Sequence, residues 1–358
     1  MSRLIRAVID TNALRHNLAV IRARAGRARV IAVVKANAYG HGLVGSALAL
    51  EGADAFAVAR LEEALALRAA GIAARILLLQ GVFSAAQLED AARERLDLVV
   101  HDETQIALLE ESGATERFAL WIKIDSGMHR LGFPPAKFAA ALARIRALTP
   151  PPREVRLLTH LACANERDRQ ATHAQLACFR TATRGLGYET SIANSAGLFG
   201  DVDLGCHWVR PGLALYGASP FDDCTAERLG LMPVMTLCST VIAVRHVAGG
   251  EKVGYGSAWV APRDSVIATV AGGYGDGLHR SLKSGTPVLV AGRRATLAGR
   301  VSMDMLAVDV TGLPPVEGGA PVELWGEGLP VEEVARHAGT IAYELLCSVS
   351  QRVPLEPR

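Results

Sequence analysis

The chain has 358 residues, half of them hydrophobic, and a formal net charge of +2. This length fits one very large domain or two ordinary ones, with ample apolar material for a core. The near balance of charge gives no reason to propose a nucleic acid or an anionic membrane as partner, and we expect neither.

The N-terminal residues contain no apolar signal core, and no stretch approaches the length of a membrane span. The six cysteines are scattered and form no C-x-x-C pair. This pattern indicates reduced, mostly buried thiols rather than a disulfide or zinc framework. We therefore expect a cytoplasmic protein without a metal site.

The first predicted elements are a short strand over residues 5–9 and a helix capped by Asp10 or Thr11. Residues 30–42 then read VIAVVKANAYGHG. Their apolar run is typical of a strand buried on both faces, and it places Lys35 at the carboxyl end of that strand. A desolvated lysine is the usual amine for a Schiff base. A lysine that extends from a strand end to solvent fits this stretch alone equally well.

Apolar strand-like runs recur along the first 230 residues and alternate with helical stretches. The runs begin near Val30, Asp54, Arg75, Leu96, Phe118, Val155, Thr190 and Cys206. Helical stretches are expected over residues 43–50, 61–70, 84–93, 103–111, 135–148 and 168–185. Eight strands in alternation with helices predict an α/β fold, a parallel (β/α)8 barrel of TIM type. A doubly wound open sheet is the competing architecture, but its G-x-G-x-x-G fingerprint after the first strand is absent.

The sequence pattern changes near residue 230. Strand-like runs separated by Gly and Pro turns follow at residues 235–245, 265–271, 287–290, 295–301, 305–310 and 322–325. In this part only residues 331–337 are expected to form a helix. We therefore predict a barrel over residues 1–230, including the short N-terminal strand, and a mostly β domain over residues 231–358.

Residues at the carboxyl ends of barrel strands usually carry the chemistry. In chain order these ends carry Lys35, Arg60, Gln80, His101, Lys123, His160, Ser195 and Arg210. Gln80 and His101 carry the least weight. The last two ends, IANSAG and RPGLALYG, occupy the position where barrel enzymes often bind phosphate. Ser195 offers a hydroxyl there, and Gly212 and Leu213 offer backbone N–H groups.

The stretch AVVKANAYGHG resembles the cofactor-lysine motif of alanine racemases, which bind pyridoxal phosphate (PLP). WIKIDSGMHRLG resembles the family's K-x-D-T-G-M-x-R-L-G, with Ser126 where threonine is usual. EKVGYGSAW, GGYGDGLHR, GRVSMDML and IAYELLCSVSQRVP resemble further family segments in order. Leu355 replaces the usual arginine after the terminal R-V-P, and Gln351 replaces a residue that is often aromatic. The resemblance nevertheless covers essentially the whole chain.

The resemblance implies which residues bind cofactor and substrate. Lys35 would carry PLP. The remaining cofactor contacts would come from Tyr39, His160, Ser195, Arg210, Gly212, Leu213 and Tyr343. The substrate, a small amino acid, would contact Arg130, Tyr274, Met303 and Asp304. Arg210 would face the pyridine nitrogen and leave it unprotonated, because arginine does not readily give up a proton. Lys123 is often carbamylated in the family, which would make it an anion beside Arg130.

The resemblance also implies the reaction, PLP-dependent interconversion of L-alanine and D-alanine by two-base proton transfer. Lys35 would be one base, and Tyr255 would be the other, reaching in from the second subunit of a head-to-tail homodimer. A tyrosine with the usual pKa of about 10 is a weak base at neutral pH. A chain of His160 and Arg210 would activate it.

Three other functions compete with this one. An amino-acid decarboxylase of the same architecture usually has a glycine-rich phosphate loop, and a cysteine at the place of Tyr255. A non-catalytic PLP carrier resembles the barrel alone, so the residues after 231 argue against it. A racemase of another small amino acid, such as serine, stays open because a small pocket rejects one extra hydroxyl only weakly. Supply and breakdown of D-alanine both fit the sequence.

Overall fold

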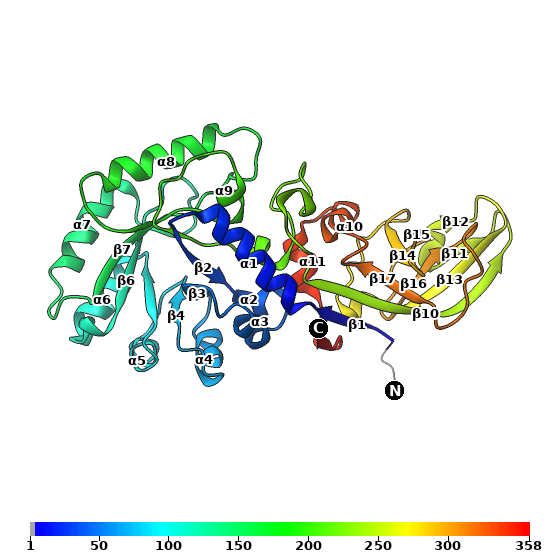
Figure 1. Ribbon diagram of the computed structural model, residues 1–358, viewed down its shortest axis with the longest axis horizontal. Helices are drawn as coiled ribbons and strands as arrows, with labels where there is room; N and C mark the ends of the chain where they lie inside the picture. The colour runs from blue at the N-terminus through cyan, green and yellow to red at the C-terminus, as the bar shows by residue number, and fades with distance from the viewer. Residues whose placement is uncertain (1–3) are drawn as a thin grey trace.

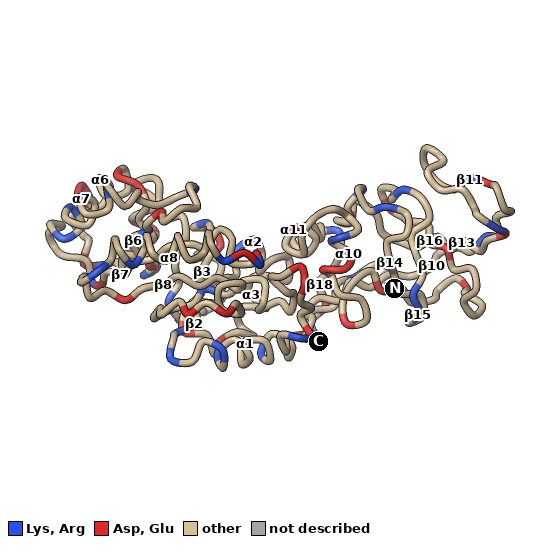
Figure 2. The backbone as a smooth tube through the Cα atoms, turned by 90° about the horizontal axis from the view of Figure 1, so that it is seen from above, with Lys and Arg blue, Asp and Glu red and all other residues tan. Residues whose placement is uncertain are grey.

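A computed structural model describes residues 4–358 as two units that lie side by side along the longest axis of the molecule (Figure 1). A barrel of strands surrounded by helices forms one unit, and a mostly antiparallel sheet forms the other. No helix within these residues is long and apolar enough to cross a membrane. Acidic and basic positions are interspersed along both units (Figure 2).

The first unit is a closed barrel of eight parallel strands, which confirms the predicted fold class. Its strands are β2 (Arg29–Val33), β3 (Ala55–Val58), β4 (Arg75–Leu78), β5 (Asp97–Val100), β6 (Ala119–Lys123), β7 (Glu154–Leu158), β8 (Thr190–Ser191) and β9 (Trp208–Val209). Each begins within two residues of the predicted start. The barrel closes because β9 pairs with β2. Strands such as β3 and β5 are buried at every position, as their continuous apolar runs require.

Helices surround the barrel, and most of them connect its strands. They are α1 (Thr11–Ala25), α3 (Leu43–Ala49), α4 (Leu61–Ala69), α5 (Ala85–Arg93), α6 (Glu103–Ser112), α7 (Pro135–Arg146), α8 (Gln170–Thr183) and α9 (Ser195–Phe199). The short segment α2 (Lys35–Tyr39) follows β2 and is a left-handed turn rather than an α-helix. Side chains of Asp10, Ser84 and Asp102 cap α1, α5 and α6 by accepting hydrogen bonds from first-turn N–H groups.

The second unit is built on an eight-stranded sheet in the order β13-β16-β15-β14-β17-β10-β1-β18. Its strands are β10 (Met235–Val247), β13 (Ser265–Ala271), β14 (Pro287–Val290), β15 (Arg293–Leu297), β16 (Met305–Asp309), β17 (Pro321–Trp325), β1 (Arg6–Ile9) and β18 (Leu355–Pro357). A separate hairpin contains β11 (Lys252–Val253) and β12 (Trp259–Val260). The helices of this unit are α10 (Val331–Ala338) and α11 (Ala342–Ser348).

Two expectations need correction in this second unit. The N-terminal strand, which the sequence pattern assigns to the barrel, pairs antiparallel with β10 and parallel with β18, so it belongs to the second sheet. The reason is that its hydrogen-bonding partners lie more than 200 residues away in the chain. The sequence also predicts a single helix here, whereas α11 follows α10 directly.

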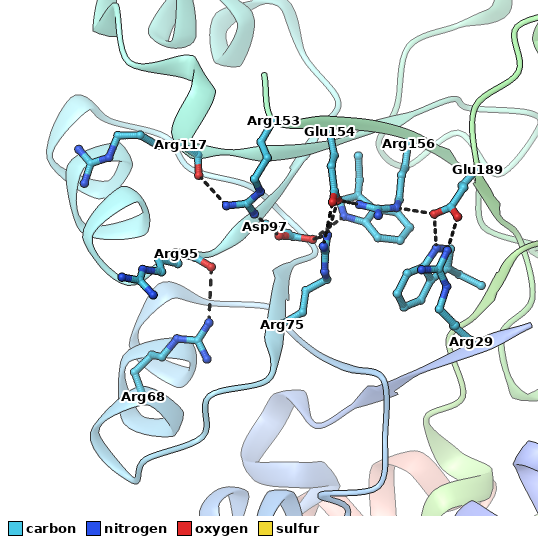
Figure 3. A network of polar contacts seen from close by, with 12 residues as sticks. Arg29, Arg68, Arg75, Arg95, Asp97, Arg117, Arg153, Glu154, Arg156 and Glu189 are labelled. Carbon is cyan, nitrogen blue, oxygen red and sulfur yellow. Dashed lines mark hydrogen bonds and ion pairs between the residues drawn. The ribbon is translucent and has the colours of Figure 1, made fainter. Parts of the chain in front are cut away.

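The amino ends of the barrel strands carry a network of charged side chains, on the side away from the strand ends considered above (Figure 3). Asp97 accepts hydrogen bonds from Arg75 at 2.7 Å and from the indole N–H of Trp121 at 3.0 Å. Glu189 accepts from Arg156 at 2.8 Å. These pairs stabilise charges that would otherwise be costly to bury at the amino-terminal end of the barrel.

Candidate active site

A cavity of about 740 Å³ lies at the carboxyl ends of the barrel strands. Ten of the fourteen site residues predicted from the sequence line this cavity. They are Lys35, Tyr39, Lys123, Arg130, His160, Ser195, Arg210, Gly212, Leu213 and Tyr343. Gln80 also lines the cavity, although it was one of the two strand-end residues least expected to belong to the site. The barrel topology therefore brings side chains from separate strands into one site.

The other four nominated residues lie in the second unit, outside this cavity of their own chain. Tyr255 sits between β11 and β12, and 69% of it is exposed. Tyr274 and Met303 are also exposed. They are neighbours, because the Met303 carbonyl accepts a hydrogen bond from the residue after Tyr274. Asp304 forms an ion pair with Arg352 at 2.6 Å.

The backbone after Lys35 takes an unusual conformation. β2 ends at Val33, and Lys35 follows two residues later rather than at the last strand position. Residues 36–39 all have φ between 52° and 54°, which is the left-handed helical region. Residues other than glycine and asparagine cost about 1–2 kcal/mol each in this region, so Ala36, Ala38 and Tyr39 are strained here. The next residue, Gly40, must lack a side chain, because a Cβ there would lie 2.1 Å from the Leu346 carbonyl oxygen.

Aromatic packing holds the far end of this turn. The Tyr39 ring stacks on Tyr216 with 4.8 Å between centroids, and it lies 5.9 Å from the Tyr343 ring. Tyr343 comes from α11, so the second unit contributes a wall to the cavity in the barrel. Burial raises the pKa of both Tyr39 and Tyr343, so both hydroxyls stay protonated at neutral pH.

The cavity is strongly cationic. Burial and the nearby Arg130 lower the pKa of the Lys35 amine. Burial, Arg210 and Arg130 lower the pKa of Lys123 to about 8. Desolvation and like charges disfavour the protonated form of both amines, which favours the neutral, nucleophilic form. The donor set suits a ligand that carries a phosphate and a carboxylate.

His160 and Arg210 are in direct contact. The Arg210 guanidinium donates hydrogen bonds to Ser191 Oγ and to the Thr159 carbonyl, each at 2.6 Å, and to His160 Nδ1 at 3.2 Å. Because arginine can only donate, His160 Nδ1 accepts and the ring hydrogen lies on Nε2. Burial and the charge of Arg210 hold the pKa of His160 well below its usual range, so the imidazole is neutral.

The two segments expected to bind phosphate do meet. Ser195 Oγ accepts hydrogen bonds from the N–H groups of Gly212 at 3.0 Å and Ala214 at 3.2 Å. The Gly212 N–H, expected to face a phosphate, therefore faces Ser195 here. The Ser195 hydroxyl hydrogen and the Leu213 N–H remain as donors for an anion. A Cβ on residue 212 would lie 2.3 Å from the Tyr39 hydroxyl oxygen, so this close approach requires glycine.

The geometry of this site can be compared with known proteins. The sequence profile of the alanine racemase N-terminal domain matches residues 9–220, and that of the C-terminal domain matches residues 234–356. The chain belongs to the alanine racemase family. An alanine racemase of Halorhodospira halophila is 49% identical over 358 residues, covering 100% of this chain and 98% of the relative.

Alanine racemases of both physiological kinds are similar to the chain. A protein of Pseudomonas putida named "Alanine racemase, catabolic" is 50% identical over 353 residues, covering 98% of each chain. The crystal structure of the biosynthetic alanine racemase from Pseudomonas aeruginosa superposes with a TM-score of 0.96 and 48% identity, covering 100% of both chains. The two relatives differ by only two percentage points in identity, so identity does not separate the two physiological roles.

The alanine racemase segment IAYELLCSVSQRVP contributes Ile341, Ala342 and Cys347 to the cavity besides Tyr343, and of these three the sequence pattern missed one with reactive chemistry, Cys347. The cysteines were expected to be mostly buried, but none of the six is, and Cys347 is exposed and lines the cavity. It lies four residues after Tyr343 on α11, so both side chains share one helix face. Recognising α11 as a helix would have revealed this pairing. No group of three or more potential metal ligands gathers within residues 4–358.

Proposed function

We propose that the chain interconverts L-alanine and D-alanine with PLP as its cofactor. One observation supports this most directly. Lys35, whose amine is partly desolvated, lines a cavity together with Arg130, Lys123 and Arg210. The chain's relatives over its full length are alanine racemases. When bound, PLP withdraws electrons from the substrate's α-carbon and so acidifies its α-proton.

The residues present fit this cofactor. Lys35 supplies the amine that would hold it covalently. The Ser195 hydroxyl and the Leu213 N–H would bind its phosphate, with Tyr39 and Tyr343 beside them. Arg210, fixed by its hydrogen bonds to Ser191 and Thr159, would face the ring nitrogen as a donor. Arg130 would bind the substrate carboxylate as a charged partner.

Racemisation requires a base on each side of the substrate's α-carbon. Lys35 would be one base, because burial lowers the pKa of its amine and so favours the unprotonated, basic form. Tyr255 of a partner subunit would be the other. The neutral His160 lines the cavity, its Nδ1 accepts from Arg210, and its Nε2–H would orient that tyrosine's oxygen. The donated hydrogen bond would favour the phenolate, which is the basic form.

This scheme requires a head-to-tail homodimer. Tyr255, Tyr274, Met303 and Asp304 lie outside the cavity of their own chain, and the first three are substantially exposed. We therefore propose that the second unit of each subunit completes the site of the other. We also propose a domain boundary near residue 230, between the two profile matches, with the N-terminal strand assigned to the second domain.

Two measurements test the function. Purified protein should form D-alanine from L-alanine, and a panel of other L-amino acids, including serine, should react more slowly. Borohydride reduction followed by peptide mapping should find the pyridoxyl group on Lys35. A label on Lys123 or Lys252, or release of carbon dioxide from the substrate, would contradict the proposal.

A further inference from the structure

A carboxylate outside the cavity holds the backbone that follows Lys35. Glu63 lies in the first turn of α4, just after β3. Its Oε1 accepts a hydrogen bond from the Ala36 N–H at 2.6 Å. Its Oε2 accepts from the N–H groups of Ala59 at 2.9 Å and Arg60 at 3.1 Å. The carboxylate thus joins the segments that follow two neighbouring barrel strands, β2 and β3.

Glu63 lies outside the cavity, where it can position the backbone but cannot contact a bound ligand. Ala36 and Ala59 both line the cavity, whereas Glu63 does not. Acidic and basic positions adjoin each other beside α2 (Figure 2). The Glu63 carboxylate also raises the pKa of Lys35, against the larger lowering by burial and by Arg130.

The segment that Glu63 holds is the left-handed turn at residues 36–39, which is strained because three of its four residues are neither glycine nor asparagine. The middle and far end of the turn have their own anchors. Asn37 Oδ1 accepts from the Leu43 N–H at 2.8 Å, and His41 Nδ1 donates to the last two carbonyls of the turn. Within residues 4–358, Glu63 provides the only side-chain hydrogen bond to the first residue of the turn.

We propose that Glu63 is a positioning residue for Lys35. It fastens the start of the left-handed turn to the end of β3, and so aims the neighbouring Lys35 amine into the cavity. The inference rests on the proposed function, in which Lys35 carries PLP.

The two oxygens of Glu63 are both required by this geometry. Each faces backbone N–H donors on a different strand connection. In Glu63→Gln one of these oxygens becomes an NH₂ group, which donates and cannot accept. The variant must therefore release either residue 36 or residues 59 and 60. Glu63→Asp keeps the charge but is one methylene shorter, so it cannot span both sides. Glu62→Gln is the matched control, because Glu62 is the exposed neighbour in the same helical turn.

The test uses the full-length protein, with PLP removed and then added back. Its first readout is the rate at which added PLP is captured, followed by absorbance and by borohydride labelling of Lys35. We expect Glu63→Gln and Glu63→Asp to slow capture by about tenfold or more, because charge-assisted hydrogen bonds are lost. Glu62→Gln should match the wild type.

The second readout is backbone hydrogen exchange, which does not depend on the cofactor. Exchange over residues 34–43 should increase in both Glu63 variants, whereas exchange over α6 stays unchanged. A lower kcat at unchanged KM is expected for alanine, because the substrate contacts are intact. The melting temperature is recorded for every variant to show that it folds. If Glu63→Gln does not fold, the same two readouts on Glu63→Asp decide the question.

Two results would overturn the inference. One is wild-type capture and exchange in Glu63→Gln. The other is wild-type behaviour of Glu63→Asp alongside a slow Glu63→Gln, which would mean that charge alone matters. Failure of the proposed function would look different, because the wild-type protein itself would then carry no label on Lys35.

Discussion

Replacing Asp97 by alanine tests how much the charged network at the amino-terminal end of the barrel contributes to stability. The Asp97 side chain is 1% exposed and accepts from Arg75 and from the Trp121 indole. Its removal leaves a buried indole N–H without an acceptor, which costs about 1–3 kcal/mol. Arg75 loses one partner but keeps Glu154. We therefore expect the free energy of unfolding to fall by about 3 kcal/mol, the low end for breaking a buried ion pair.

The assay is urea unfolding followed by tryptophan fluorescence, since Trp121 lies within the network. Protein concentration must be held fixed, because an oligomer's stability depends on it. Asp90→Ala is the control. Its ion pair is with the exposed Arg93, so a change of less than about 0.5 kcal/mol is expected. A loss of less than about 1 kcal/mol for Asp97→Ala would refute the reasoning. The kcat of the folded variant should stay at the wild-type value.

The remaining predictions concern both the site and stability. Lys123 should be a carbamate paired with Arg130 in crystals grown with bicarbonate, because a bare ammonium would crowd that arginine; density for an unmodified amine would contradict this. Tyr255→Phe should suppress exchange of the α-hydrogen with solvent far more from L-alanine than from D-alanine, and equal suppression would argue against separate bases. Although burial opposes it, hydrogen bonds from two arginines hold the pKa of Glu154 at about 2, below its ordinary 4.5. A depressed pKa in the folded state stabilises the protein above pH 4.5, and that stabilisation should be lost between pH 4.5 and about 2. Glu154→Gln should flatten this part of the pH–stability curve, and an unchanged curve would show that other groups control it.

The barrel could be predicted because each of its strands is buried on both faces. Such strands appear as continuous apolar runs, and a parallel barrel then fixes where their carboxyl ends meet. Residues as distant in sequence as Lys35 and Arg210 could therefore be assigned to one cavity from their positions at strand ends.

Other features could not be predicted, for identifiable physical reasons. The pairing of β1 with β10 depends on contacts across more than 200 residues. The left-handed turn after Lys35 goes against the preference of Ala36, Ala38 and Tyr39, and only Asn37 adopts this conformation readily, so tertiary contacts are needed to explain it. Glu63 looks like an ordinary acidic residue in the first turn of a surface helix, and only the structure shows that it also reaches residue 36.

The arrangement of the active site across two subunits can be tested with a mixed dimer. Lys35→Ala and Tyr255→Phe subunits should each be inactive as homodimers. If each site takes Lys35 from one chain and Tyr255 from the other, the mixed dimer has one doubly impaired site and one intact site. Its activity should then be about half that of the wild type. If both residues came from the same chain, every site would carry one lesion. A mixed dimer without activity would therefore contradict the shared site.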